Sequence, residues 1–401
     1  MNPLRSSIVI CLMLLAPLAC YSETGVTKDT VVIGQSAALT GPAAAIGQAM
    51  RDGALIYFET VNAAGGVHGR NIKLITLDDG FEPDVAKANT LKLIHDQKVF
   101  ALFGYTGTSS SYAALPIFSY EDVPFFAPYT GTEGLRVPFN RVVFNIRASY
   151  ADETEKLVEW MVSQRKTRIA VFYEADSHGQ AGYEGVQAAM ERRQLKIVAK
   201  GSVWRNSVDV APAVKLISAA KPHAVIMIST YKPAAAFIKE YNSTGQRPEY
   251  LNVSLVGAKA LASELGREAH GVIVSQVVPY PLYPSGIVRE MRSLIKARRP
   301  NSNPTFNEVE GYVAAKAFVE GLLRAGPDLT RDKFIAALES FRDVDLGQYK
   351  LNFSPDDHSG SKFVEMTVIV GNGEFLPLKP APTALKRSSA VDRPVASKPS
   401  F

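Results

Sequence analysis

Cysteine is almost absent from this chain of 401 residues, and both copies, Cys11 and Cys20, lie close to the N-terminus. The chain beyond residue 20 therefore has neither thiol chemistry nor a disulfide, and its stability has to come from the size of its core. Runs of five or more charges of one sign are also missing, although the formal net charge is +5. This even mixture of signs argues against nucleic acid as a partner.

Long apolar runs are equally scarce. The one near the N-terminus, residues 8–18, follows Arg5 and is too short to span a bilayer. Small residues follow it, so residues 1–22 are predicted to be a secretory signal that is cleaved between Ala19 and Glu23 and directs the protein to the periplasm. A lipoprotein acylated at Cys20 is the less favoured alternative, because Pro17 stands where such signals usually carry an aliphatic residue.

Motifs of catalysis and of phosphate binding are missing too. The sequence has no G-x-x-x-x-G-K-[ST], no G-x-S-x-G and no H-E-x-x-H, and no G-x-G-x-x-G follows its first predicted strand. Its six histidines are never at the spacing that places two metal ligands on one helix face. We therefore expect no metal or cofactor, and a binding protein rather than an enzyme. A hydrolase whose triad assembles only in space stays open as a less favoured alternative.

Short apolar runs alternate with helical patterns along most of the chain. Residues 31–34, 72–77, 99–103 and 168–173 are predicted strands, and residues 46–61, 83–95, 183–193 and 233–241 are predicted helices. Residues 174–179 are a predicted loop, and Ser149 and Asp152 are predicted to form a capping box at the start of a further helix. Such alternation indicates parallel sheets with helices on both faces, which bind ligands at the carboxyl ends of their strands. It is too long for one ordinary sheet and divides near residue 148. The fold class predicted is α/β, with two doubly wound parallel-sheet lobes.

Hydroxyl side chains follow one of these strands. Residues 99–103 lead through a glycine loop to Thr108, Ser109 and Ser110, where a helix is predicted to begin. Two interpretations stay open at this point. The hydroxyls either cap their own helix or, with the amides of its first turn, hold a carboxylate.

Several motifs together resemble the periplasmic branched-chain amino-acid binding proteins, the type I substrate-binding proteins of ABC importers. The resemblance runs from about residue 31 to residue 370. It rests on Leu39-Thr40-Gly41-Pro42, Asn62-Ala63-Ala64-Gly65-Gly66-Val67-His68-Gly69-Arg70, Asp78-Asp79, the loop from Gly104 to Ser111, and Glu310-Gly311-Tyr312.

The resemblance implies two lobes that are joined by three crossovers and close like a hinge. Lobe one would comprise residues 24–146 and 280–345, and lobe two residues 147–279 and 346–378. Residues 379–401, rich in Ala, Pro, Ser and Lys, are predicted to be a disordered tail.

The resemblance also implies where the ligand lies. Two loops of lobe one would hold its carboxylate, and lobe two would close over it with His178, where the family has an aromatic residue, and with Tyr231. Glu308 is a weaker candidate, and Glu310 is expected only to favour the dipole of its helix. The predicted ligand-binding residues are Thr108, Ser109, Ser110, Tyr129, Thr130, Gly131, His178, Tyr231 and Glu308.

Two departures from the family leave the ligand open. Residues 256–259 are apolar, glycine or basic, whereas amino-acid binders carry near there an acid that pairs with the ligand's ammonium group, and Ile46 stands where some of them have an aromatic residue. An amino acid would then need Asp176 or Glu308 as its partner, and an aromatic or aliphatic acid is an equal alternative.

The function expected is capture of a small carboxylate-bearing ligand and its delivery, by a monomer, to the permease of an ABC importer. A periplasmic sensor that presents its ligand to a membrane receptor is the alternative.

Overall fold

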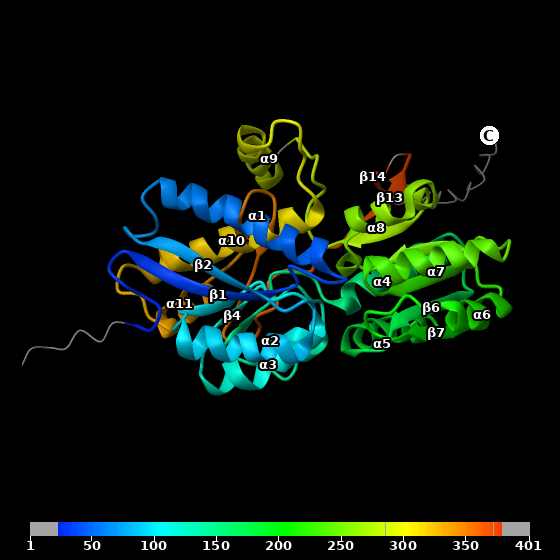
Figure 1. The fold of residues 1–401 in the computed structure, drawn as a ribbon, viewed down its shortest axis with the longest axis horizontal. Helices are drawn as coiled ribbons and strands as arrows, with labels where there is room; N and C mark the ends of the chain where they lie inside the picture. Colours follow the sequence, from blue (N-terminus) through cyan, green and yellow to red (C-terminus); the bar gives the residue numbers. More distant parts are fainter. Residues whose placement is uncertain (1–22, 285, 372, 379–401) are drawn as a thin grey trace, which may run out of the picture.

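The computed structural model describes residues 23–284, 286–371 and 373–378. The predicted signal and the predicted tail lie outside these ranges. Figure 1 shows two α/β lobes side by side, each built on its own sheet. Within the described ranges, no helix combines the length and the apolar character needed to cross a membrane.

The first lobe is built on a five-stranded parallel sheet in the order β2-β1-β3-β4-β5. Helices α1 and α10 pack together on one face, and α2 and α3 cover the other (Figure 1). The strands are β1 (Thr30–Ala37), β2 (Asn71–Asp78), β3 (Ala101–Phe103), β4 (Phe125–Phe126) and β5 (Val143–Phe144); the helices are α1 (Ala44–Ala63), α2 (Pro83–Leu91), which continues as a π-helical turn (Lys92–Asp96), α3 (Thr108–Tyr120), α9 (Gly286–Arg298), α10 (Phe306–Ala325) and α11 (Arg331–Glu339).

Two glycines allow α1 and α10 to approach closely. A Cβ on Gly53 would lie 2.0 Å from the carbonyl oxygen of Glu308, and one on Gly311 would lie 2.0 Å from that of Met50. Any larger side chain would force the two helices apart. This contact fixes the start of α10, which carries Asn307 and Glu308, against α1.

The second lobe is built on a seven-stranded sheet in the order β14-β13-β10-β9-β8-β6-β7, in which only β13 and β14 run antiparallel to their neighbours. The strands are β6 (Ile169–Glu174), β7 (Lys200–Val203), β8 (Ala224–Ile228), β9 (Glu249–Asn252), β10 (Ile273–Gln276), β13 (Glu365–Val370) and β14 (Glu374–Pro377); the helices are α4 (Tyr150–Ser163), α5 (Ser177–Glu191), α6 (Ala211–Ala219), α7 (Tyr231–Ser243) and α8 (Ala258–Leu265).

Three connecting segments meet between the lobes. Asn145 of the first segment pairs with the third, since its amide donates to His358 O (2.9 Å) and its carbonyl accepts from Gly360 N (2.7 Å). The hydroxyl of Tyr349 donates to Ile146 O of the first segment (2.7 Å) and to Val277 O of the second (3.2 Å). Backbone bonds and the Tyr349 side chain therefore hold the three crossovers together.

The last stretch of the chain reaches the second sheet later than the predicted boundary at residue 346. A small hairpin of β11 (Val344–Asp345) and β12 (Lys350–Leu351) comes first. The ring of Phe353 then packs on Phe144 of β5, with 5.3 Å between the ring centroids, and β13 begins only at Glu365.

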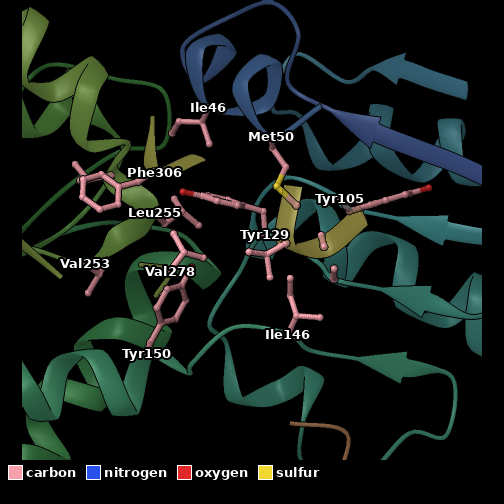
Figure 2. Packing of buried hydrophobic residues seen from close by; sticks show 14 of the residues in the cluster. Ile46, Met50, Tyr105, Tyr129, Ile146, Tyr150, Val253, Leu255, Val278 and Phe306 are labelled. Carbon is pink, nitrogen blue, oxygen red and sulfur yellow. The ribbon is translucent and has the colours of Figure 1, made fainter. Parts of the chain in front are cut away.

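Buried side chains of both lobes belong to one continuous apolar cluster. Figure 2 shows part of it: Ile46 and Met50 of α1 and Tyr129 come from the first lobe, and Tyr150 and Leu255 from the second. The two lobes are therefore in contact through their cores as well as through the crossovers.

Candidate functional site

Glycine, and not a hydroxyl residue, caps helix α3. Its N-cap is Gly107, with φ of 93°, and among the described residues no side chain makes the capping bond. A Cβ at this position would lie 2.5 Å from the ring of Phe81, which together with the positive φ explains the glycine. The interpretation that Thr108 and Ser109 cap their own helix is therefore wrong, and their hydroxyls are directed elsewhere.

Thr108 bonds across to the neighbouring loop after β4. Its hydroxyl lies 2.6 Å from that of Thr130, which in turn lies 3.2 Å from the hydroxyl of Tyr150, the first residue of α4. The amide of Tyr150 also donates to Gly131 O (2.7 Å). Ser149 caps α4 in a capping box with Asp152, as the sequence predicted. The capped helix thus places a lobe-two tyrosine against both loops of lobe one.

Ser109 connects the first turn of α3 to the first turn of α5. Its hydroxyl lies 2.8 Å from that of Ser177 and donates to Asp176 (3.2 Å), which caps α5 by accepting from Gly179 N (2.9 Å). Helix α5 therefore begins at Ser177, where the sequence had predicted a loop followed by a helix from residue 183. Because the N-terminus of each helix is the positive end of its dipole, the two helices together favour a negative charge.

His178 lies in this same first turn and is 1% exposed. Its ring is 5.1 Å from that of Tyr150, and neither ring nitrogen has a hydrogen-bond partner among the described residues. Burial lowers the pKa of His178 to about 4; Asp176 opposes this shift, while Arg205 and Arg147 add to it. The imidazole is therefore neutral at pH 7, with one nitrogen able to donate and the other to accept.

Other buried hydroxyls nearby in the fold are also unpartnered within the described ranges. They are those of Thr106 and Ser110, in the loop and first turn after β3, and of Ser229, in the loop after β8. Buried polar groups nearly always have partners, so a group of unpartnered ones at the carboxyl ends of parallel strands is typical of a ligand site.

Tyr231 lies at the start of α7, beside Ser229, and lines a cavity of about 520 Å³ between α1, α8 and α10. Ile46, Gly257, Asn307 and Glu308 line the same cavity. Tyr129 reaches it indirectly, because its hydroxyl accepts from the amide nitrogen of Asn307 (2.6 Å) and donates to Ser254 O (3.3 Å). The predicted site residues therefore fall into two groups, a buried polar one around Thr108 and His178 and one at this cavity.

The carboxylate of Glu308 already has two partners within lobe one. It accepts from Thr305 N (2.7 Å) in a capping box that begins α10 and pairs with Arg299 (2.7 Å). Of the nine predicted residues, this one has the clearest structural role.

Arg205 and Arg147 bridge the lobes, and the sequence analysis named neither. Arg205 follows β7 and pairs with Asp176 of its own lobe. Its guanidinium also donates to the hydroxyl of Ser109 (3.2 Å) and to Phe81 O in lobe one, and it stacks on the ring of Phe81 at 4.2 Å. Arg147, in the first crossover, is fully buried and pairs with Glu153 and Glu310, each at 3.2 Å. No local pattern marks either residue, because the partners are distant in sequence or lie on another element.

A metal centre has no support in the residues that the structure describes, where no group of three His, Cys, Asp or Glu side chains could hold an ion.

Comparisons with known proteins agree with this architecture. The family model described as periplasmic binding protein matches residues 30–374. The "Amino acid binding protein" of Pseudomonas aeruginosa is 26% identical over 286 residues, which are 69% of this chain and 76% of that protein.

Solved structures show the same fold. A possible leucine/isoleucine/valine-binding protein from Rhodopirellula baltica is 33% identical, with a TM-score of 0.82 over 88% of this chain and 96% of that one. A fatty acid ABC transporter substrate-binding protein from Thermomonospora curvata has a TM-score of 0.81 at 20% identity, over 89% of this chain and 93% of that one. The match of the family model over most of the chain shows that this protein belongs to the periplasmic binding protein family.

Proposed function

We propose that this protein captures a small carboxylate-bearing ligand between its two lobes in the periplasm and delivers it, as a monomer, to the permease of an ABC importer. Membership of the periplasmic binding protein family supports capture and transport. Binding closes the lobes about the crossovers, and the closed form is the one that the permease receives.

One observation carries the proposal for the ligand's charge. The N-termini of α3 and α5 meet at Ser109 and Ser177, and buried groups without partners accompany them, among them both ring nitrogens of His178. Hydroxyls, a neutral imidazole and free helix amides all donate to a carboxylate without bringing a charge of their own.

The residues proposed to contact the ligand divide by task. Thr108, Ser110 and Thr130 hold the carboxylate with the backbone at Gly131, and Ser109 joins the two helix N-termini. His178 and Tyr231 enclose the rest of the ligand from lobe two. Tyr129 and Glu308 support the site from the hinge side, through Asn307 and the α10 cap respectively.

A thermal-shift screen against amino acids, aromatic acids and aliphatic acids tests the proposal. A ligand at a hundredfold its dissociation constant stabilises the folded protein by about 2.7 kcal/mol, which gives a clear rise in Tm. Chemical conversion of a stabilising compound would contradict a pure binding role, and no stabilisation by any of the acids would contradict carboxylate capture.

A further inference from the structure

The acidic side chains around the proposed site already have partners. Asp176 pairs with Arg205 and caps α5, and Glu308 pairs with Arg299 and caps α10. These are the two residues to which the sequence analysis looked for a partner to an amino group. Both oxygens of each carboxylate already have a partner, and each negative charge is balanced by an arginine, so neither residue offers an unpaired charge to a ligand cation.

The deeper carboxylates are engaged in the same way. Glu174 accepts from the amide and the hydroxyl of Thr230, both at 3.1 Å, and burial raises its pKa to about 7. Glu153 accepts from Ser254 N (2.7 Å) and from the hydroxyl of Ser275 (2.6 Å) while it pairs with Arg147. Their charge is either partly neutralised or balanced within the fold.

The cavity between α1, α8 and α10 offers no buried acid besides Glu308. Asp52 and Glu264 also line it, but Glu264 is exposed, and Asp52 is half-exposed and pairs with Arg51 at 2.7 Å. Carboxylates in contact with water compensate a buried cation only weakly. The lobe-two wall also carries Lys259, whose charge disfavours a cation, and it approaches α1 closely, since a Cβ on Gly257 would lie 2.9 Å from Ile46 Cγ1.

The unpartnered polar atoms of the buried site include no free anion. Within the described ranges, those around α3, α5 and β8 belong to the neutral side chains of Thr106, Ser110, His178 and Ser229 and to Arg205, whose Nε is a cationic donor. Their hydroxyls and imidazole can donate to an anion, whereas an ammonium group would be enclosed beside two positive helix ends without a counter-charge.

Building on the proposed function, we infer that the ligand is a small carboxylate that carries no ammonium group. The site selects its ligand by charge at the α-carbon: a hydrogen or a hydroxyl group there is accepted and a protonated amine is rejected.

Calorimetric titration with matched ligand series tests this inference. Each series keeps one carbon skeleton and changes only the α-substituent, for skeletons of three sizes. The probes are propanoate, lactate and alanine; 4-methylpentanoate, 2-hydroxy-4-methylpentanoate and leucine; and 3-phenylpropanoate, 3-phenyllactate and phenylalanine.

The acid and the hydroxy acid of at least one skeleton are expected to bind within about tenfold of each other, and the amino acid at least about 100-fold more weakly, which is about 2.7 kcal/mol. The hydroxy acid serves as the steric control, because it is close to the amino acid in size but uncharged at the α-carbon. Rejection of the hydroxy acid to the same extent as the amino acid would show that space and not charge decides, and would overturn the inference.

Two further outcomes separate this inference from the function on which it rests. Tightest binding of an amino acid would overturn the inference and leave carboxylate capture intact. No binding by any member of the three series would overturn carboxylate capture and the inference with it.

Discussion

At the residue scale, the 2.6 Å contact between the hydroxyls of Thr108 and Thr130 is the centre of the proposed carboxylate site. Thr108→Val keeps the shape of the side chain and removes its hydroxyl. Ligand affinity is expected to fall by about 2- to 13-fold, which corresponds to the contribution of one hydrogen bond (about 0.5–1.5 kcal/mol), and further if the bond is to a charged carboxylate. Isothermal titration measures the change.

Thr60→Val is the matched control for this substitution. The hydroxyl of Thr60 bonds only to Ile56 O of its own helix, at 2.7 Å, so the same isosteric change there is expected to leave affinity unaltered. Equal affinity of the two variants would remove Thr108 from the site.

Burial of His178 predicts a pH dependence of binding. The pKa is about 4 in this closed arrangement and about 6.5 for a histidine exposed to water. Above pH 6.5 the ring is neutral in both states, so affinity is flat. Below pH 6.5 His178 binds a proton in the open state but not in the closed state, so closure of the lobes becomes less favourable. Affinity at pH 5 is expected to be about 30-fold lower than at pH 7.5.

A comparison with His178→Gln isolates the histidine from other titrating groups. Glu174 acts in the opposite sense, because its raised pKa favours the closed form as the pH falls. Titrations at pH 5, 6 and 7.5 with both proteins give the difference in slope. Parallel pH profiles would show that His178 does not change its exposure on binding.

The same residue shows where sequence reasoning ended. The family resemblance implied that His178 lies near the ligand, but not its place in a helical first turn or its lack of partners. The helical turn follows from Asp176 capping α5, a local signal that the predicted loop overlooked, whereas the packing of the ring depends on Tyr150, which is distant in sequence.

At the scale of elements, the loop after β7 and the start of α2 form a latch across the lobes. Arg205 reaches Phe81 and Ser109, and Asn206 donates to Glu82 (2.6 Å). Arg205→Ala is expected to raise the rate of ligand release by about tenfold, with a smaller effect on the association rate, because these contacts exist only when the lobes meet. Stopped-flow release of ligand measures both rates.

Arg192→Ala provides the control for the latch. Arg192 pairs with Glu155 inside lobe two and makes no side-chain bond to the described part of lobe one, so its removal is expected to leave release unchanged. Equal release rates for the two variants would contradict a role of Arg205 in holding the lobes closed.

Element order was largely predictable from the sequence, whereas the roles of element ends were not. The spacing of apolar residues predicted the ends of α1 and α7 to within about two residues, because a helix with one buried face carries apolar residues at a period of 3.6. The capping box at Ser149 and Asp152 was also predicted and is confirmed, because all of its partners are local. A hydroxyl cap of α3 was one of two interpretations left open and is wrong, since Gly107 is the cap and its constraint comes from Phe81, twenty-six positions earlier.

At the scale of the whole molecule, the crossovers surround a buried ion network. Arg147 pairs with Glu153 of lobe two and Glu310 of lobe one and stacks on Tyr129 at 4.8 Å. Arg147→Met leaves both carboxylates buried without their cation, so the free energy of unfolding is expected to fall by about 3–5 kcal/mol. Urea denaturation measures it.

Arg141→Met is the matched control, since Arg141 also pairs with two carboxylates, Asp122 and Asp332, but all three are exposed. Its effect is expected to stay below about 1 kcal/mol. A difference between the two variants smaller than about 1 kcal/mol would show that the buried network adds no more than a surface one.

The sequence by itself determined the fold class, the two-lobed plan and the place of the hydroxyl loops, because periodicity, glycine and capping signals act over a few residues. Only the tertiary structure decided which charged side chains are already paired within the protein. Asp176 and Glu308 are paired with arginines of their own lobes, Arg205 and Arg299, and Glu310 with Arg147 of the first crossover. Pairings between side chains of separate loops and helices leave no trace in local sequence.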